Sequence, residues 1–143
     1  MRPTRRHSRG GFTLIELMIV VSIIGLLAAI LVPFVGNQLE AARQDTTRAA
    51  MTETITALTY YKGDHGKFPS KLDELTKEKN KKTKDPYLPK LLRDSWNEEL
   101  HYSPKDGGKD FELVSYGADR QRGGSEFDAD ITATKSGFQD LAE

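Results

Sequence analysis

Apolar residues are concentrated in one stretch near the N-terminus of the chain. Residues 12–35 contain a single charged residue, Glu16. At about 1.5 Å per residue, a helix of this length measures roughly 36 Å, which is enough to cross a lipid bilayer. The pattern therefore predicts one membrane segment, followed by a polar portion that makes up most of the chain.

A different pattern begins after residue 35, where apolar positions recur with helical spacing. Met51, Ile55 and Leu58 follow the i, i+4, i+7 spacing of one helix face. We therefore predict a single long helix over about residues 12–62. Pro33 lies inside it, and because proline lacks a backbone N–H, we expect a kink or a locally loosened helix there.

Shorter elements are expected after the long helix. Ser70 and Asp73 have the spacing of a capping box, which predicts a short helix that ends near Thr76. Five of the eight residues in 77–84 are lysines. A charge run of this kind is typical of an exposed loop, so we predict that this segment is solvated.

The C-terminal half carries the pattern of a small antiparallel sheet. Residues 100–103 and 111–116 flank the turn sequence Asp106-Gly107-Gly108 and are predicted to pair as a hairpin, although the sequence does not place a third strand. Trp96 and the Tyr60-Tyr61 pair are expected to pack this domain onto the long helix. The predicted class is α+β, with a long N-terminal helix packed on the sheet.

Charge and cysteine content narrow the function. The 143 residues include 21 Lys and Arg, 21 Asp and Glu, and no cysteine. Four arginines precede the apolar segment, which predicts that the N-terminus stays in the cytoplasm and that the C-terminal portion lies across the membrane. No overall basic surface supports nucleic-acid binding. A small exported domain without disulfides needs another stabilising link.

The sequence offers little chemistry for catalysis. The three histidines, His7, His65 and His101, do not have metal-ligand spacing, and Ser115 is not in a nucleophile-elbow motif. No phosphate-binding or dinucleotide-binding glycine pattern is present either. We therefore expect that the protein is not an enzyme.

Hydropathy alone leaves the fate of the N-terminus open. The simplest interpretation is a secretory signal peptide. However, the apolar run is longer than a typical signal core, and no clear small-residue cleavage site follows it. A plain single-pass anchor is also consistent with hydropathy. The residues just before the apolar segment are more informative.

Gly10-Gly11-Phe12-Thr13-Leu14-Ile15-Glu16 resembles the class III signal of type IV pilins and type II secretion pseudopilins. The resemblance implies that a prepilin peptidase cuts after Gly11 and methylates the new amine of Phe12. It also implies three parts: a leader at 1–11, a transmembrane and assembly helix at 12–35, and a periplasmic domain at 36–143.

Glu16 is the exceptional residue of the membrane segment. A carboxylate in a membrane helix costs roughly 2.5–3.5 kcal/mol on insertion scales and is usually functional. The positive amine created at Phe12 is a natural partner, and Glu16 could neutralise the Phe12 amine of a neighbouring chain. The alternative is that Glu16 reaches the lipid headgroups near the membrane edge.

The segments after the helix resemble the major pseudopilin of the type II secretion system, the G subunit. The similar segments are 61–69, Asp94-Ser95-Trp96, and residues 115–131. The last of these resembles the group's calcium-binding loop and implies a Ca²⁺ site with the ligands Asp119, Asp128 and Asp130.

The chain departs from that group at several positions. Ser95 stands where the group has proline, and Arg120 and Glu126 stand where glycine is common. The lysine-rich segment 77–84 also departs from the group's pattern.

The resemblance implies a type IV pilin-like fold and a structural role. The chain would lie in the bacterial inner membrane as a single-pass protein and would form a homopolymeric filament that pushes folded proteins through an outer-membrane secretin. The implied partners are minor pseudopilins, the prepilin peptidase, the inner-membrane platform and the secretion ATPase. Two alternatives stay open: a type IV pilin for adhesion, motility or DNA uptake, and a monomeric membrane-anchored binding module.

Overall fold

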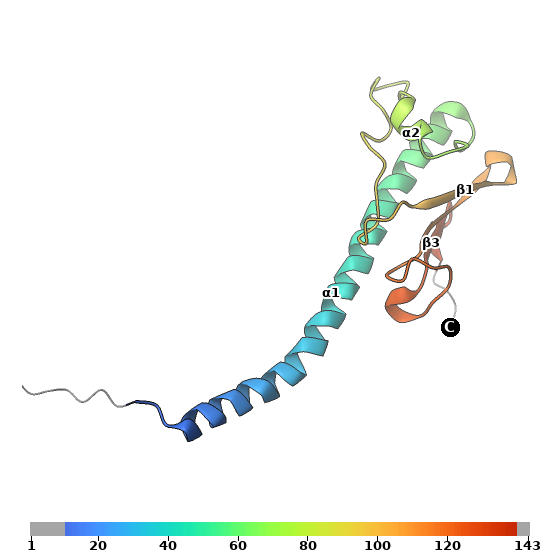
Figure 1. Cartoon of the computed structure of the whole chain (residues 1–143). Coiled ribbons are helices and arrows are strands. Elements are labelled where there is room, and N and C mark those ends of the chain that lie inside the picture. The colour runs from blue at the N-terminus through green and yellow to red at the C-terminus, as the bar shows by residue number, and fades with distance from the viewer. Residues whose placement is uncertain (1–10, 140–143) are drawn as a thin grey trace, which may run out of the picture. The chain divides into compact units, whose positions relative to one another are not determined.

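The computed structural model describes residues 11–139, so most of the predicted leader lies outside the described residues. The chain divides into two compact units, residues 1–38 and residues 39–143, and each is described by itself. Figure 1 shows the order of the elements along the chain.

One helix, α1 (Leu14–His65), passes through both units, as the hydrophobic pattern predicts. The helix continues through residue 33, and the kink or loosening expected at Pro33 stays a prediction. The helix begins two residues after Phe12 because Thr13 and Glu16 cap it. The Thr13 N–H donates to Oε2 of Glu16 (2.8 Å), and the Glu16 N–H donates to Oγ1 of Thr13 (3.3 Å). This reciprocal capping box satisfies backbone donors in the first turn.

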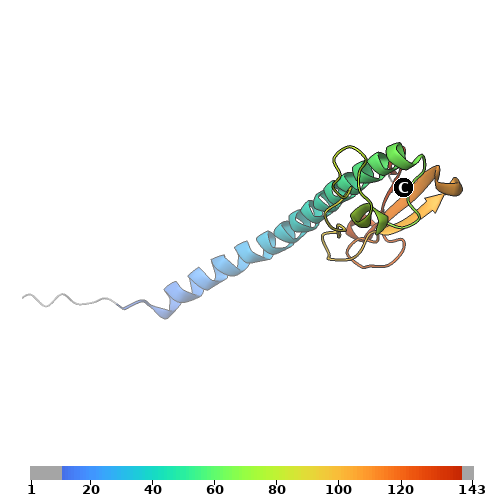
Figure 2. The same cartoon turned by 90° about the horizontal axis from the view of Figure 1, so that it is seen from above.

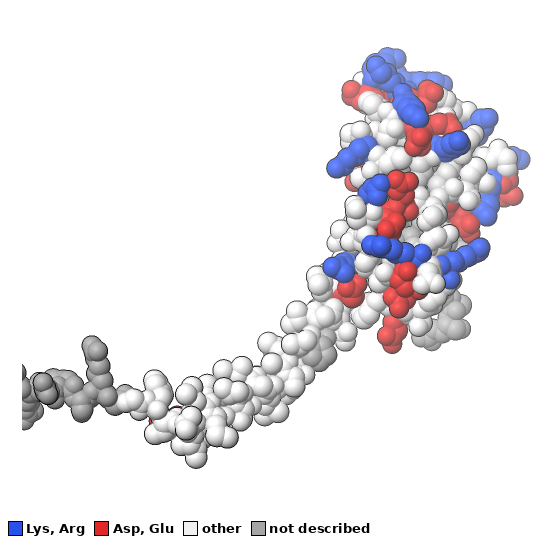
Figure 3. All heavy atoms as spheres, in the orientation of Figure 1, with Lys and Arg blue, Asp and Glu red and all other residues white. Residues whose placement is uncertain are grey.

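The N-terminal unit presents apolar side chains to its surroundings. Phe12 is 87% exposed and Leu14 is 82% exposed, and the large apolar residues that follow are more than half exposed. Figure 3 shows this segment almost free of charge, whereas Lys, Arg, Asp and Glu are mixed over the other unit. A segment of α1 is long and apolar enough to cross a membrane.

The second unit contains a four-stranded antiparallel sheet in the order β1-β2-β3-β4. The predicted hairpin is confirmed: β1 (His101–Lys105) pairs with β2 (Asp110–Ser115) across the turn at Asp106–Gly108. The sequence did not place β3 (Ile131–Thr134) or β4 (Gly137–Gln139), which are only four and three residues long.

The core lies between one face of this sheet and the C-terminal half of α1, which run beside each other in Figures 1 and 2. Phe111, Leu113 and Ser115 alternate inward along β2. Phe111 and Leu113 meet Met51 and Leu58 of α1 in a single cluster of buried side chains. The predicted α+β class is therefore confirmed.

Two local predictions were wrong. The predicted short helix is present as α2 (Glu74–Lys77), but Ser70 and Asp73 do not form the expected capping box, since the side chain of Asp73 forms no cap. The Glu74 carboxylate instead accepts the N–H groups of Ser70 (2.9 Å) and Lys71 (3.1 Å). Of the tyrosine pair, Tyr61 is buried as expected, but Tyr60 is 62% exposed because adjacent helix positions point about 100° apart.

Replacing Leu113 with alanine should destabilise the second unit strongly, because Leu113 is fully buried in the core cluster. We expect the free energy of unfolding to fall by about 2–5 kcal/mol, as for other buried leucines. Urea denaturation of the detergent-solubilised chain measures this change. Val114→Ala, on the opposite face of β2, is the matched control and should cost much less; equal losses would contradict the assigned core face.

Candidate functional site

The predicted cleavage site lies in exposed, non-helical backbone. Gly11 and Phe12 both precede α1, and both are exposed. A peptidase needs access to backbone that is not held in a helix, and the Gly11–Phe12 bond lies before α1 and is exposed. Whether it is cut, and whether Phe12 is then methylated, stay predictions.

Glu16 already has partners in the uncut chain. Its Oε2 accepts both the Thr13 N–H (2.8 Å) and the Thr13 hydroxyl (3.0 Å). The partners expected from the sequence were the Phe12 amine or the lipid headgroups, and this cap was missed, although Thr13-x-x-Glu16 has the spacing of a capping box. The carboxylate of Glu16 is therefore held by Thr13, the residue that directly follows the predicted new N-terminus at Phe12.

The structure places Asp119, Asp128 and Asp130 on the loop between β2 and β3, but it does not gather them around one point. Asp119 accepts the N–H of Gln121 (2.9 Å), and Asp128 is exposed. Among residues 11–139, no three acidic or histidine side chains are placed to hold a metal ion. The predicted ligand set is thus not assembled in this conformation.

Asp130 differs from the other two aspartates. Its Oδ2 accepts the N–H of Gly123 (3.0 Å), whereas its Oδ1 is buried and has no hydrogen-bond partner among residues 11–139. An unsatisfied buried carboxylate oxygen is costly, and a cation would satisfy it. One buried carboxylate oxygen of this loop is therefore open to a cation, whereas the three predicted ligands are not brought together.

Close backbone packing explains the glycines of this loop. Gly124 has φ +89°, and a Cβ at this position would lie 2.2 Å from the carbonyl oxygen of Asp128. Gly117, with φ +69°, is similarly pressed against the carbonyls of Phe127 and Ala129. Only glycine fits such approaches without displacing the chain.

Two long-range contacts attach the loop to the rest of the unit. The Nε of Arg120 lies 3.1 Å from Oε1 of Glu98, and the Gln44 side chain donates to the carbonyl of Glu126 (2.9 Å). From the sequence, Arg120 was noted only because it stands where glycine is common in the related group. It occupies the left-handed region at φ +59° and supplies an ion pair that glycine could not.

Asp94 organises the turn that precedes the sheet. It is 7% exposed and accepts hydrogen bonds from the Ser115 hydroxyl (2.7 Å) and from the N–H groups of Trp96 (3.0 Å) and Glu98 (2.8 Å). Charged acceptors form stronger hydrogen bonds than neutral ones. The aspartate therefore joins the turn to the end of β2.

The change from proline to Ser95 has a direct structural role. The Ser95 N–H donates to Oγ1 of Thr47 on α1 (3.1 Å), a bond that proline could not form. Next to it, the Trp96 indole is half-buried and donates to Glu40 of α1 (3.2 Å). The predicted packing of Trp96 onto the helix is confirmed.

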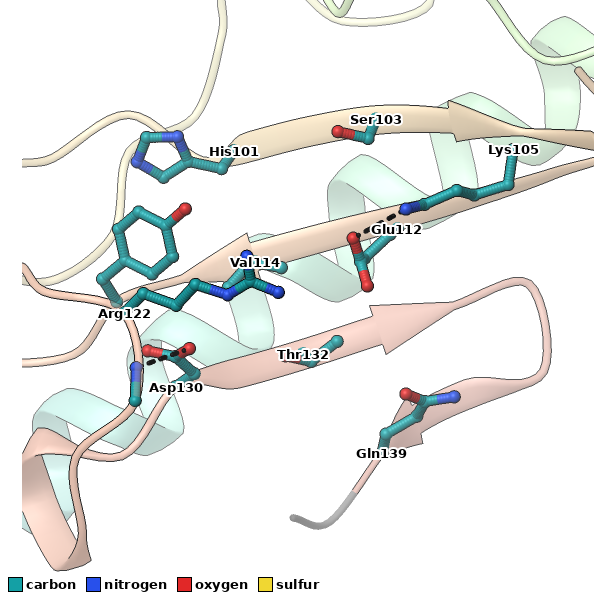
Figure 4. A pocket seen from close by; sticks show the side chains of 11 residues that line it. His101, Ser103, Lys105, Glu112, Val114, Arg122, Asp130, Thr132 and Gln139 are labelled. Carbon is teal, nitrogen blue, oxygen red and sulfur yellow. Dashed lines mark hydrogen bonds and ion pairs between the residues drawn. The ribbon is translucent and has the colours of Figure 1, made fainter.

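The outer face of the sheet carries an open polar groove of about 580 Å³. Figure 4 shows His101, Ser103 and Lys105 of β1 above Glu112 of β2, with Arg122 reaching over the sheet. Lys105 and Glu112 form an ion pair (3.2 Å). The groove is an open polar surface that carries this ion pair, not an enclosed pocket.

Comparison with known proteins decides the family. A sequence model for the type II secretion system protein G matches residues 34–134, and a model for the prokaryotic N-terminal methylation motif matches residues 6–32. The chain belongs to the protein G family of the type II secretion system. This family is a structural one, so the chain is a subunit of a secretion pseudopilus rather than a member of a known enzyme family.

Individual relatives support the same assignment over nearly the whole chain. The chain is 38% identical over 136 residues to the type II secretion system core protein G of Pseudomonas aeruginosa, which covers 89% of this chain and 96% of the relative. The counterpart from Vibrio cholerae is 35% identical over 140 residues, covering 92% and 94%. Membership in the protein G family favours the pseudopilin over a surface pilin and over a monomeric tether.

Removing the Asp94 carboxylate should loosen the turn before the sheet. We expect Asp94→Ala to lower the free energy of unfolding by about 3 kcal/mol, because it leaves three donors without their acceptor. Chemical denaturation measures the loss. Asp85→Ala, at an exposed loop position, serves as the control, and an equal effect of both changes would show that Asp94 has no special role.

Proposed function

We propose that copies of this chain polymerise through the apolar helix at residues 12–35, in the bacterial inner membrane, with residues 36–143 in the periplasm. The growing filament would push folded proteins through an outer-membrane secretin. The protein G family match supports the secretion role. The exposed apolar side chains of the N-terminal unit support assembly, because such a surface must be covered by lipid or by protein.

Maturation creates the polymerising form in this proposal. A prepilin peptidase removes residues 1–11 and methylates Phe12. The match to the N-terminal methylation motif supports this step, and so does the exposure of the Gly11–Phe12 bond. Cleavage leaves a positive amine directly before Thr13, where the uncut chain has a neutral peptide bond.

Glu16 then selects the next subunit. In the uncut chain Oε2 of Glu16 is held by Thr13 at the first turn of α1. After cleavage, the Phe12 amine of an incoming copy would pair with this carboxylate. In the low dielectric of the membrane such pairing is far stronger than in water. It therefore offsets the cost of burying the charge and sets the register between neighbouring helices.

The remaining partners follow from the secretion system. Minor pseudopilins would start or end the filament, and an inner-membrane platform with the secretion ATPase would drive its growth. Nucleic acid is not among the proposed partners, because the chain has as many acidic residues as basic ones, 21 of each.

We further propose that Ca²⁺ stabilises the loop between β2 and β3. The supporting observation is the buried, unpartnered Oδ1 of Asp130. Asp119 and Asp128 would have to move toward it, and backbone carbonyls or water would complete the six to eight oxygens that calcium prefers. Because the chain has no cysteine, the bound calcium ion would take the place of a disulfide in holding the C-terminal loop to the rest of the unit.

Replacing Glu16 with alanine tests the assembly mechanism. We expect normal cleavage after Gly11 but loss of filaments, because the incoming Phe12 amine then has no partner in the membrane. Mass spectrometry of the mature N-terminus reports cleavage, and electron microscopy of sheared filaments reports assembly. Glu16→Asp is the control, since it keeps the charge and should retain partial assembly. Normal filaments from the alanine variant would contradict the mechanism.

Calcium should raise the melting temperature of the purified full chain in detergent. At a calcium concentration about 100 times the dissociation constant, the stabilisation is about 2.7 kcal/mol. Asp128→Ala should abolish this shift, whereas Asp85→Ala, outside the loop, should leave it unchanged. The same melting temperature with chelator and with saturating calcium would remove the metal from the account.

A further inference from the structure

The lysine-rich segment 77–84 is attached to the end of α1 through Asp64. The Lys81 N–H donates to Oδ2 of Asp64 (2.9 Å), and the Tyr87 hydroxyl donates to the same oxygen (2.7 Å). The Lys81 ammonium also donates to the Asp64 carbonyl. The segment is therefore a positioned loop and not merely the solvated one that its composition predicts.

The electrostatics of this attachment favour a fixed loop. Hydrogen bonds from the Lys81 backbone and from Tyr87 hold the pKa of Asp64 below its usual range. Because a lowered pKa favours the ionised carboxylate, the attachment is present at neutral pH and weakens only as the pH falls through that lowered value.

A groove of about 610 Å³ opens between this loop and the last turns of α1. It is lined by Tyr60, Lys82, Thr83 and Tyr87, among others. Tyr60 is 62% exposed there, on the face of α1 that points away from the core. The groove thus combines an exposed aromatic ring with a lysine side chain.

The amines around the groove are not neutralised within the described chain. Lys79, Lys82 and Lys84 are exposed, and among residues 11–139 none of them forms an ion pair. Figure 3 shows the resulting concentration of positive charge at this end of the unit. A partner for this surface must supply carboxylates or another anion.

The same unit exposes carboxylates at a different level of α1. The loop between β2 and β3 carries Glu126 and Asp128 at its surface, and Gln44 attaches it to the helix. Gln44 and Asp64 are twenty residues apart on α1, which corresponds to about 30 Å along the axis. Figure 1 shows the two loops at these separate levels.

Arginines in the acidic loop do not cancel its charge at this surface. Arg120 is already paired with Glu98 of its own chain (3.1 Å). Arg122 lies over the outer face of the sheet, beside Asp130 (Figure 4). Glu126 is exposed, and it lies outside the predicted calcium ligand set of Asp119, Asp128 and Asp130.

We propose that the groove at residues 77–84 receives the acidic loop of a second copy of this chain, with Glu126 paired to Lys82. This inference rests on the proposed function, because a filament holds its copies parallel. Two parallel copies displaced by about 30 Å along the helix axis bring the basic loop of one to the level of the acidic loop of the next. The contact joins two different surfaces, so it repeats along a filament and does not close.

A disulfide cross-link tests this contact directly, because the natural chain has no cysteine. The full chain would carry Lys82→Cys together with Glu126→Cys and would be oxidised mildly after filaments form in cells. A disulfide needs Cα atoms within about 7 Å. The two loops are attached to α1 at points about 30 Å apart along its axis, so the two cysteines can join only between copies. We expect a ladder of covalent multimers on a non-reducing gel.

The matched control pairs Lys90→Cys with Glu126→Cys, because Lys90 is an exposed lysine outside the groove. This pair should give little cross-linking, with at least a tenfold smaller multimer fraction. Equal ladders from both pairs, or filaments without a ladder from the Lys82 pair, would overturn the inference and leave the proposed function intact. An unaltered chain that forms no filaments would overturn both.

Charge reversal gives a second, independent result. Lys82→Glu should reduce the amount of filament several-fold, and Glu126→Lys in the same chain should restore it, whereas Lys82→Arg should have little effect. If Lys82→Glu leaves filaments normal but abolishes binding to vesicles of acidic phospholipid, the loop binds membranes instead, and the inference is wrong.

Discussion

The main physical constraint on this chain is an exposed apolar helix segment that carries a single carboxylate, Glu16. The side chains of residues 12–35 described here are exposed, so this segment has no internal partner and must be covered by lipid or by other copies. Glu16 makes lipid alone an expensive solution, because a charge in the bilayer needs a partner. In the uncut chain Thr13 supplies hydrogen bonds to it, and processing would add a positive charge beside it. In the proposed assembly, the added charge would offset the cost of placing Glu16 in the membrane.

The second unit is constrained in a different way. It is a small domain without cysteine, so its long loops must be held in place by contacts other than disulfides. Polar contacts from α1 reach each loop: Thr47 to Ser95, Glu40 to Trp96, Gln44 to Glu126, and Asp64 to the lysine-rich segment. The same helix therefore positions the loops along its C-terminal half, while its N-terminal end is the part proposed to assemble with other copies. A rigid set of loops on α1 is what a repeated contact between copies requires.

The parts that were predictable from the sequence are those encoded locally. The long helix, the β1–β2 hairpin and the N-terminal motif follow from periodicity, a glycine turn and contiguous residues. The strands β3 and β4 are too short to give a pattern, and the Asp94–Ser115 and Arg120–Glu98 contacts join distant segments. Tyr60 was misassigned because only its neighbour lies on the core face of α1. The three aspartates of the loop were proposed from resemblance, and the described conformation leaves them apart.

The most direct test of the central claim is a high-resolution electron cryomicroscopy structure of filaments assembled from the processed chain. The account predicts that residues 12–35 of neighbouring copies pack together, with the Glu16 carboxylate within hydrogen-bond distance of the Phe12 amine of another copy. Filaments held only by contacts between the C-terminal units, with Glu16 facing lipid or solvent, would contradict it.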